Sequence, residues 1–380
     1  MIDPSAWQVM QIARIVFLLC FLPVLLYRIW RLWRQPASAP AIAITAFGAV
    51  MWFWLLLLSD FLWSVLPVQI RAASMGGWFV ATVAACVQIF VLGISGSASP
   101  ARMRRAWRIV LAITAVVLVV VAVSAQHSQA LLATEDLNEL TNALLDGADS
   151  GAVVASVVSN GYLTATLVQL IWAGYRHADS TPVGTGLGLL AVASLFEVVC
   201  VFVGGIWRPL TGGHDLVSAR YGMLLQSVSG GVGITLMAVG FLWPPIVLRV
   251  QARRHERRLR PLHDEFVGLF PQLFPPMESQ FRLSDKVFEW STHIQDGLTL
   301  LAQSREVPLE TDTPPPDGES RRALDVANWI VGQSNPGFSG EWLRAPAGVS
   351  DEAWVLAIAD AYRDHAEVRV RPEVNVSVCR

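Results

Sequence analysis

The pattern of hydrophobic and polar positions divides this 380-residue chain into two parts. The first 250 residues contain long apolar runs that are separated by short polar segments. Each run can cross a bilayer as a helix, because one crossing needs about 20 apolar residues. The pattern therefore predicts an all-α fold with a seven-helix transmembrane domain over residues 1–248. The seven runs cover about 10–30, 42–65, 75–95, 106–125, 152–174, 185–206 and 219–243.

The remaining residues, 249–380, have the composition of a soluble domain and predict a small helical unit. Within 281–303, five apolar residues recur at helical spacing and so define a core-facing stripe. The stripe consists of Val287, Trp290, Ile294, Leu298 and Leu301. Further helices are predicted near 261–270, 321–333 and 350–366. The proline-containing segment at about 306–320 predicts a flexible linker, and the alternating tail 368–378 predicts an extended end.

Arginines are concentrated in alternate loops, and this distribution predicts the orientation. The loops that follow the first, third and fifth runs are rich in arginine, whereas the other loops contain only Arg71, Arg208 and Arg220. Basic loops favour the cytoplasmic side. We therefore expect a multi-pass plasma-membrane protein with its N-terminus outside and its C-terminus in the cytoplasm. The arginines of the basic loops are Arg28, Arg31, Arg34, Arg102, Arg104, Arg105, Arg108 and Arg176.

The longest outer loop, between the fourth and fifth runs, predicts a short amphipathic helix. Leu137, Leu140 and Leu144 share one face of it, and acidic residues up to Asp149 fill the rest. We expect this helix to lie on the outer surface or to cap the bundle, and its carboxylates to face water rather than to bind a cation.

Glu197 lies near the middle of the sixth run, where an ionised side chain costs several kcal/mol. The same helical face carries mostly small residues, which allow another helix to approach closely. The seventh run has a matching face, so we expect the last two membrane helices to be tightly packed antiparallel neighbours. The two faces consist of Gly186, Leu190, Ala193, Cys200 and Gly204, and of Gly222, Gln226, Ser229, Gly233 and Gly240.

Two interpretations of Glu197 stay open. It is protonated or hydrogen-bonded and fixes the helix register, or it belongs to a ligand, ion or proton site. Its candidate partners are Gln226, Asn160, Gln169 and Gln88. The candidate site residues are Glu197, Gln226, Asn160 and Asp60, although Asp60, near the outer end of the second run, also suits the membrane interface.

A basic segment follows the seventh run. Pro244 and Pro245 are expected to kink or stop the helix. Arginines after them are expected to contact anionic lipid headgroups of the inner leaflet. Residues 261–380 contain 10 basic and 19 acidic residues, a balance of −9 that argues against binding to nucleic acid. The headgroup candidates are Arg253, Arg254, Arg257 and Arg258.

The sequence lacks the patterns of the common enzyme and metal sites. His255-Glu256 does not continue to HExxH, and GxxxxGK[ST], GxGxxG and GxSxG do not occur in the C-terminal part. The four cysteines, Cys20, Cys86, Cys200 and Cys379, have no paired spacing. We therefore expect neither an enzyme nor a cofactor, a metal or a disulfide.

Together, the seven runs, the arginine-rich exit, LRPLHDEF (259–266) and VFEWSTHIQDGLTLL (287–301) resemble an actinobacterial family of seven-helix membrane proteins. The most specific part is Ile294, Asp296, Gly297 and Leu298; this chain has Gln295 where the family often has arginine. The resemblance implies a helical cytoplasmic domain on a seven-span bundle, in a family classed as transporters. It implies no substrate and no catalytic residue. Asp296-Gly297 is expected to cap or bend its helix.

Two functional hypotheses follow. The first is a non-enzymatic sensor or scaffold that presents the acidic helical domain to an unknown cytoplasmic protein. The second is a transporter or channel for an ion or small solute, with Glu197 in the bundle interior. The residues leave self-association open.

Overall fold

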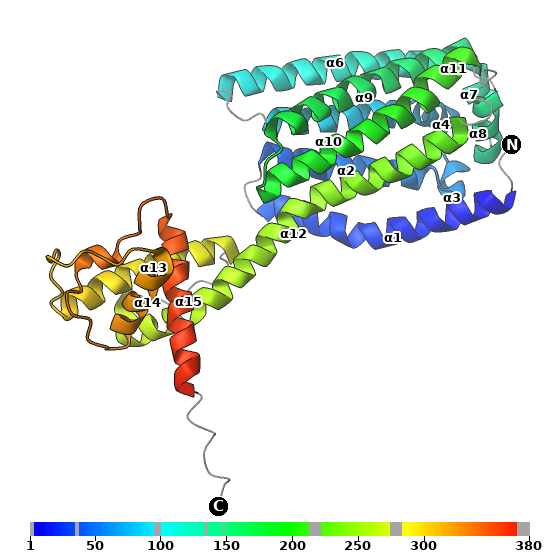
Figure 1. Cartoon of the computed structure of the whole chain (residues 1–380). Helices are drawn as coiled ribbons and strands as arrows, with labels where there is room; N and C mark the ends of the chain where they lie inside the picture. The colour runs from blue at the N-terminus through cyan, green and yellow to red at the C-terminus, as the bar shows by residue number, and fades with distance from the viewer. Residues whose placement is uncertain are drawn as a thin grey trace, which may run out of the picture. The chain divides into compact units, whose positions relative to one another are not determined.

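The computed structural model divides the chain into two compact units, Met1–Pro244 and Pro245–Arg380 (Figure 1). This division lies close to the predicted boundary after residue 248. Every regular element in the described residues is a helix. The structure describes residues 4–34, 38–94, 100–133, 136–146, 149–212, 222–273 and 283–370.

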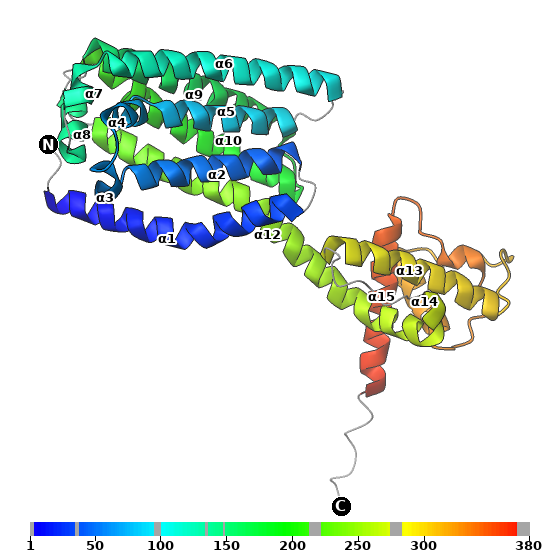
Figure 2. The same ribbon diagram turned by 180° about the vertical axis from the view of Figure 1, so that it is seen from behind.

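The first unit, here called the membrane unit, is a bundle of long helices (Figures 1 and 2). Helix α9 lies at its centre and contacts α5, α6 and α10, while α2 contacts α1 and α5. Shorter helices α3, α4, α7 and α8 gather at one end. The long helices are α1 (Pro4–Arg34), α2 (Ala39–Leu57), α5 (Trp78–Ile94), α6 (Pro100–Gln126), α9 (Ser150–His177), α10 (Pro182–Val201) and α12 (Met223–Leu269). The short ones are α3 (Asp60–Trp63), α4 (Val68–Met75), α7 (Gln129–Ala133) and α8 (Leu137–Asp146).

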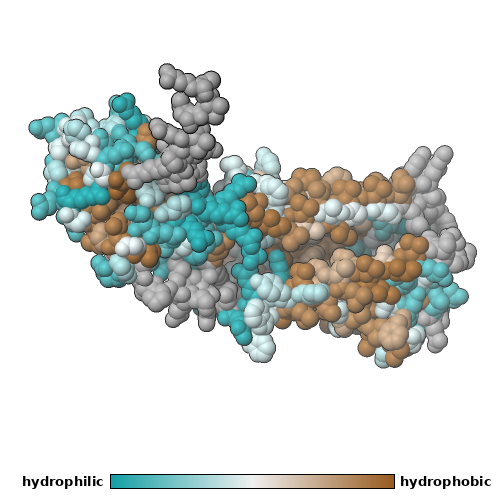
Figure 3. Space-filling model, turned by 90° about the horizontal axis from the view of Figure 1, so that it is seen from below, coloured by the Kyte–Doolittle hydropathy of each residue, from teal (hydrophilic) through white to brown (hydrophobic). Residues whose placement is uncertain are grey.

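Six helices of the described residues are long and apolar enough to cross a membrane. A seventh crossing is reached only when α4 and α5, which meet at an angle of 50°, are counted as one span. Large apolar side chains cover the outside of the bundle, as the brown surface in Figure 3 shows. Ile12 of α1 and Val116 of α6 are 63% and 64% exposed. Such a surface suits acyl chains and indicates a multi-pass membrane protein.

The predicted amphipathic helix is α8. Leu137 and Leu140 are buried, and they pack with Trp63 and Leu131 at the end of the bundle. Asp149 does more than face water, because its carboxylate accepts hydrogen bonds from Ala152 N in α9 (2.9 Å) and from Ala130 N in α7 (3.1 Å). One carboxylate thus satisfies free N–H groups at the starts of two helices.

Replacing Asp149 with alanine should lower stability by about 1–2 kcal/mol at pH 7, because two helix starts lose their acceptor. Partial burial raises the pKa of Asp149. The hydrogen bonds that it accepts, among them those from Ala152 and Ala130, lower the pKa by more, so the net pKa lies below the ordinary value. The native carboxylate therefore adds stability above the unfolded pKa and loses it as the pH falls through the folded pKa. Thermal unfolding should show the difference between the two proteins closing in acid.

Glu139→Ala is the matched control for that experiment, since it removes an exposed carboxylate from α8. It should shift the unfolding midpoint little at either pH. Equal losses in the two variants would mean that removal of acidic charge, and not the loss of a helix cap, causes the effect.

The sixth predicted span contains an irregularity that the sequence did not predict. Helix α10 continues into the π-helix η1 (Phe202–Trp207) and then into α11 (Arg208–Thr211). Ser156 of α9 donates a hydrogen bond from Oγ to the carbonyl of Gly205 in η1 (2.8 Å). Because π-helical turns are rare and often occur at functional sites, η1 indicates a candidate functional site in this part of the bundle.

The predicted close packing of the last two membrane helices is confirmed. A Cβ added at Gly240 of α12 would lie 2.9 Å from Cγ of Leu190 and 3.2 Å from the carbonyl oxygen of Gly186, both in α10. A Cβ added at Gly186 would lie 2.7 Å from Cγ of Pro244. The two helices therefore approach each other at a distance that only glycine permits at these positions.

Of the two alternatives predicted for Pro244 and Pro245, a kink or a stop, the stop is wrong, because α12 continues to Leu269. Pro244 lacks the N–H that the Gly240 carbonyl would accept. The close approach of Gly186 covers that carbonyl with another helix backbone. Helices in membranes tolerate proline where neighbouring helices cover the freed backbone group.

The second unit, here called the C-terminal unit, is built from the end of α12 and three further helices. The predicted stripe of α13 is confirmed, since all five of its residues are buried, and they pack on Leu259, Leu262 and Phe266 of α12. Its elements are η3 (Pro271–Leu273), α13 (Leu283–Ser304), α14 (Glu319–Ile330), η4 (Gly340–Leu343) and α15 (Asp351–Val370).

Three local predictions for the C-terminal unit need correction. Asp296-Gly297 does not cap a helix, because α13 continues past it. A Cβ at Gly297 would lie 2.8 Å from Cδ1 of Phe266, so the glycine allows α12 and α13 to pack closely. The predicted linker is held in place by hydrogen bonds of 2.8 Å from Thr311 Oγ1 to Gly337 O and from Gly340 N to Pro308 O. The predicted extended tail begins as helix, and its part after Val370 lies outside the described residues.

Arg322 of α14 ties the loop around η4 to the rest of the C-terminal unit. Its guanidinium donates to the backbone carbonyls of Trp342 (3.0 Å), Glu341 and Arg344 (2.7 Å). Its carbon Cζ lies 5.4 Å from the ring centre of Trp354. Burial lowers the pKa of Arg322, and the charge of Glu341 opposes this shift. Arg322 is only 8% exposed, and one guanidinium donates to all three backbone carbonyls.

Candidate functional site

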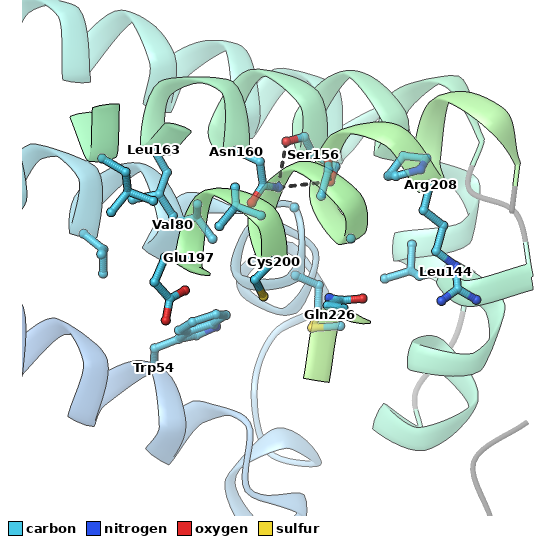
Figure 4. Close-up of a pocket in the computed structure, with 18 of the residues that line it drawn as sticks. Trp54, Val80, Leu144, Ser156, Asn160, Leu163, Glu197, Cys200, Arg208 and Gln226 are labelled. Atoms are coloured by element: carbon cyan, nitrogen blue, oxygen red, sulfur yellow. Dashed lines mark hydrogen bonds between the residues drawn. The ribbon is translucent and has the colours of Figure 1, made fainter. Parts of the chain in front are cut away.

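A cavity of about 480 Å³ lies inside the membrane unit (Figure 4). Helices α2, α5, α9, α10 and α12 form most of its wall, together with η1. The volume falls in the range of pockets that hold small molecules. Most lining residues are apolar, as is usual for such pockets, and a few polar side chains are placed among them. The main polar ones are Ser156, Asn160, Glu197, Arg208 and Gln226.

Glu197 enters the cavity from α10 and lies against α12. A Cβ added at Gly233 of α12 would lie 2.6 Å from Oε1 of Glu197, so the absence of a side chain at Gly233 makes room for the carboxyl group. Oε1 is buried and has no hydrogen-bond partner among the described residues. Figure 4 shows the carboxyl group pointing toward the indole of Trp54. A buried carboxyl oxygen without a partner is costly, which favours the ligand-site interpretation over a hydrogen bond that fixes register.

Two of the four candidate partners line the same cavity without bonding to Glu197 in the described structure. Asn160 donates from Nδ2 to Ser156 O (2.8 Å) and lies beside Ser156 in Figure 4. Gln226 of α12 lies next to Cys200, and a Cβ at Gly204 would collide with its amide. The structure thus brings Glu197, Asn160 and Gln226 together around one space.

The other two candidate partners form a separate polar group. Gln88 Nε2 donates to Gln169 Oε1 (3.4 Å), and Tyr162 donates to Gln88 Oε1 (2.8 Å). Neither glutamine lines the cavity. This group connects α5 with α9 and satisfies its own polar atoms.

Asp60 also lies outside the cavity. It is exposed at the start of α3, and its carboxylate accepts hydrogen bonds from Gln11 Nε2 (2.7 Å) and Trp7 Nε1 (3.2 Å) of α1. These bonds fasten α1 to the end of the second span. The geometry therefore favours the interfacial interpretation of Asp60.

Sequence reasoning did not select three of the cavity residues. Trp54 stood within an apolar run without any distinguishing pattern, yet its buried Nε1 has no hydrogen-bond partner among the described residues. Ser156 precedes Asn160 by one helical turn, and this spacing could have identified it. Arg208 lies at the end of the cavity away from Glu197, beside Leu144 (Figure 4).

The arginines predicted to contact lipid divide into two kinds. Arg253, Arg254 and Arg257 are exposed along α12. Arg258 instead forms an ion pair with Asp360 of α15, in which Nη2 donates to Oδ2 at 2.5 Å and Nε donates to Oδ1 at 3.1 Å. Arg258 therefore joins two helices of the C-terminal unit, and only the three exposed arginines keep the predicted headgroup role.

No protein-family model, curated protein sequence or solved structure matches this chain. The resemblance to the actinobacterial family thus stays a prediction. Within the described ranges, no group of three or more His, Cys, Asp or Glu residues could hold a metal ion. The long apolar helices define the class of the protein as a multi-pass membrane protein with an internal cavity.

Proposed function

We propose that this protein is a non-enzymatic membrane sensor, in which a small solute occupies the bundle cavity and the C-terminal unit responds. The continuity of α12 is the observation that supports this proposal. Gln226, Ile234 and Met237 of α12 line the cavity. Leu259, Leu262 and Phe266 of the same helix belong to the core of the C-terminal unit. A change in the first set of contacts therefore acts on a helix that the second set shares.

The orientation belongs to this proposal. Counting α4 and α5 as one bent span would give seven crossings. The arginine distribution supports a topology with the N-terminus outside and the C-terminal unit in the cytoplasm. There the acidic unit would meet its partner protein, and Arg253, Arg254 and Arg257 would meet anionic headgroups. Epitope tags at the two ends should be accessible on opposite sides of sealed vesicles; access to both tags from one side would refute this topology.

Hydrogen exchange of the full-length protein in nanodiscs tests the transmission of a signal. Glu197→Gln changes the charge in the cavity but keeps the shape of the side chain. We expect it to alter exchange in α13 and in the last turns of α12, while Asp60→Asn, a change of carboxylate outside the cavity, leaves both unaltered. Changes confined to α10 and its neighbours in the membrane unit would contradict the sensor proposal.

A transporter or channel is the second candidate, and the unpartnered carboxyl oxygen in the cavity favours it. Carboxylates inside membrane bundles often mark paths for protons or cations. Reconstituted vesicles should then show flux of H⁺, Na⁺ or K⁺ that is lost in Glu197→Gln and kept in Asp60→Asn. Wild-type vesicles without flux of these ions would speak against an ion path through Glu197.

A further inference from the structure

The cavity combines three features that together define the kind of ligand it fits. It has one carboxyl group with an unpartnered oxygen, an indole in the same wall toward which Figure 4 shows that carboxyl group pointing, and a lining that is otherwise mainly apolar. We propose that the cavity binds a small organic ammonium ion, with its positive charge between Glu197 and Trp54 and its apolar body along α5, α9 and α12. This inference rests on the proposed ligand role of the cavity and specifies the ligand class.

The charge of the ligand follows from Glu197. No hydrogen bond or ion pair of Glu197 occurs among the described residues, and Arg208 lies at the other end of the cavity (Figure 4). A carboxylate in apolar surroundings is strongly stabilised by a cation that reaches it. An anionic ligand would add a second like charge, and a neutral ligand would leave the carboxylate without a counterion.

The aromatic neighbour favours an ammonium group as that cation. Figure 4 shows the Glu197 carboxyl group pointing toward the Trp54 indole, and both residues line the cavity. The ring of Trp54 is stacked on Phe79, with 6.3 Å between centroids and 14° between planes, so its position is held by α5. Tryptophan is the best aromatic partner for an ammonium ion, and a carboxylate next to an indole gives the ion a second source of attraction.

The apolar wall argues against a bare metal ion. Hard cations require about six to eight oxygen ligands, whereas this cavity offers one carboxyl group and a few scattered amide and hydroxyl groups. The remaining wall includes Val83, Leu163, Ile234 and Met237. Such side chains gain free energy by covering hydrocarbon, so the ligand needs an apolar body besides its charge.

Calorimetric titration of the full-length protein in nanodiscs tests this inference. The probes are three amines with increasing apolar bodies, namely methylamine, n-butylamine and 2-phenylethylamine. The neutral and anionic comparisons for the largest amine are 2-phenylethanol and phenylacetate. We expect affinity to rise from methylamine to 2-phenylethylamine, and the alcohol and the acid to bind at least about tenfold more weakly than the matching amine.

The variants locate the binding. Glu197→Gln should weaken amine binding by about thirtyfold, since a buried charge loses its partner. Trp54→Leu should weaken it by about fivefold while Glu197 stays in place. Asp60→Asn removes a carboxylate of the same unit that lies outside the cavity, so it should leave the affinity unchanged. Unfolding midpoints of all variants, measured without ligand, identify any variant that has lost its fold. If Glu197→Gln does not fold, the affinity of Trp54→Leu for the amines tests the site by itself.

Three outcomes overturn the inference: no amine binds, the alcohol binds as well as the amine, or Glu197→Gln and Trp54→Leu both keep the wild-type affinity.

The failure of the sensor proposal can be distinguished from the failure of the ligand inference. If amines bind at Glu197 but hydrogen exchange in α13 stays the same, the ligand class stands and transmission through α12 is refuted. If a neutral or anionic probe binds and changes exchange in α13, transmission stands and the ammonium class is refuted.

Discussion

Replacing Arg322 with alanine should destabilise the C-terminal unit by at least about 3 kcal/mol. The guanidinium is the donor to three backbone carbonyls around η4, and hydrogen bonds from charged groups contribute about 1.5–3 kcal/mol each. The variant removes that donor from all three carbonyls, of which the Trp342 bond is buried, and it removes the contact with Trp354. Scanning calorimetry of the full-length protein in detergent should show the transition of this unit lowered by about 10 °C or more.

The neighbouring residue supplies the control. Arg321→Ala removes an exposed arginine from the same turn of α14 and should stay within about 0.5 kcal/mol of the wild type. Arg322→Lys keeps the charge but not the planar fork, so it should fall between the wild type and alanine. If Arg321→Ala and Arg322→Ala lower the transition equally, charge on α14 and not the contact with η4 governs stability.

Replacing Gly174 with valine should strongly destabilise the membrane unit. A Cβ at Gly174 of α9 would lie 2.6 Å from Cβ of Ala191 and 2.7 Å from the carbonyl oxygen of Leu187, both in α10. Because one of these atoms is backbone, the helices must separate to accommodate the new side chain. Overpacking of this kind costs about 3 kcal/mol, and thermal unfolding in detergent should record a clear drop of the midpoint.

Gly161→Val is the matched control on the same helix. A Cβ at Gly161 meets no atom within 4 Å, so the identical substitution should be tolerated and even gain a few tenths of a kcal/mol from helix propensity, roughly the difference between valine and glycine. If both valine variants unfold at the same lowered temperature, α9 and α10 do not have the close contact described above.

The sequence predicted those features that depend on helical periodicity. The stripe of α13 is buried as expected, because apolar residues at spacings of three and four can form only one continuous face. The small faces of α10 and α12 meet for the same reason, and Gly240 against Gly186 is the clearest instance. Periodicity also placed Glu197 on the inward side, where it lines the cavity.

Features that depend on contacts between distant segments could not be predicted in the same way. Trp54 becomes a cavity residue only because α2 lies across from α10, and no local pattern shows this. The carbonyl of Gly205 in η1 accepts a hydrogen bond from Ser156 of another helix, and no local pattern in the sixth run shows this contact. A proline predicts the loss of a hydrogen bond in its own helix, so Pro244 suggested a helix end. The sequence does not show that Gly186 of another helix approaches the freed carbonyl.

Arg322 recognises the loop at residues 341–344 through main-chain oxygens only. Every residue type carries the same carbonyl group, so this recognition does not depend on which side chains the loop displays. Substitutions at the outward positions of the loop can therefore change its surface chemistry while the path of the chain stays constant, so this surface can evolve apart from its scaffold.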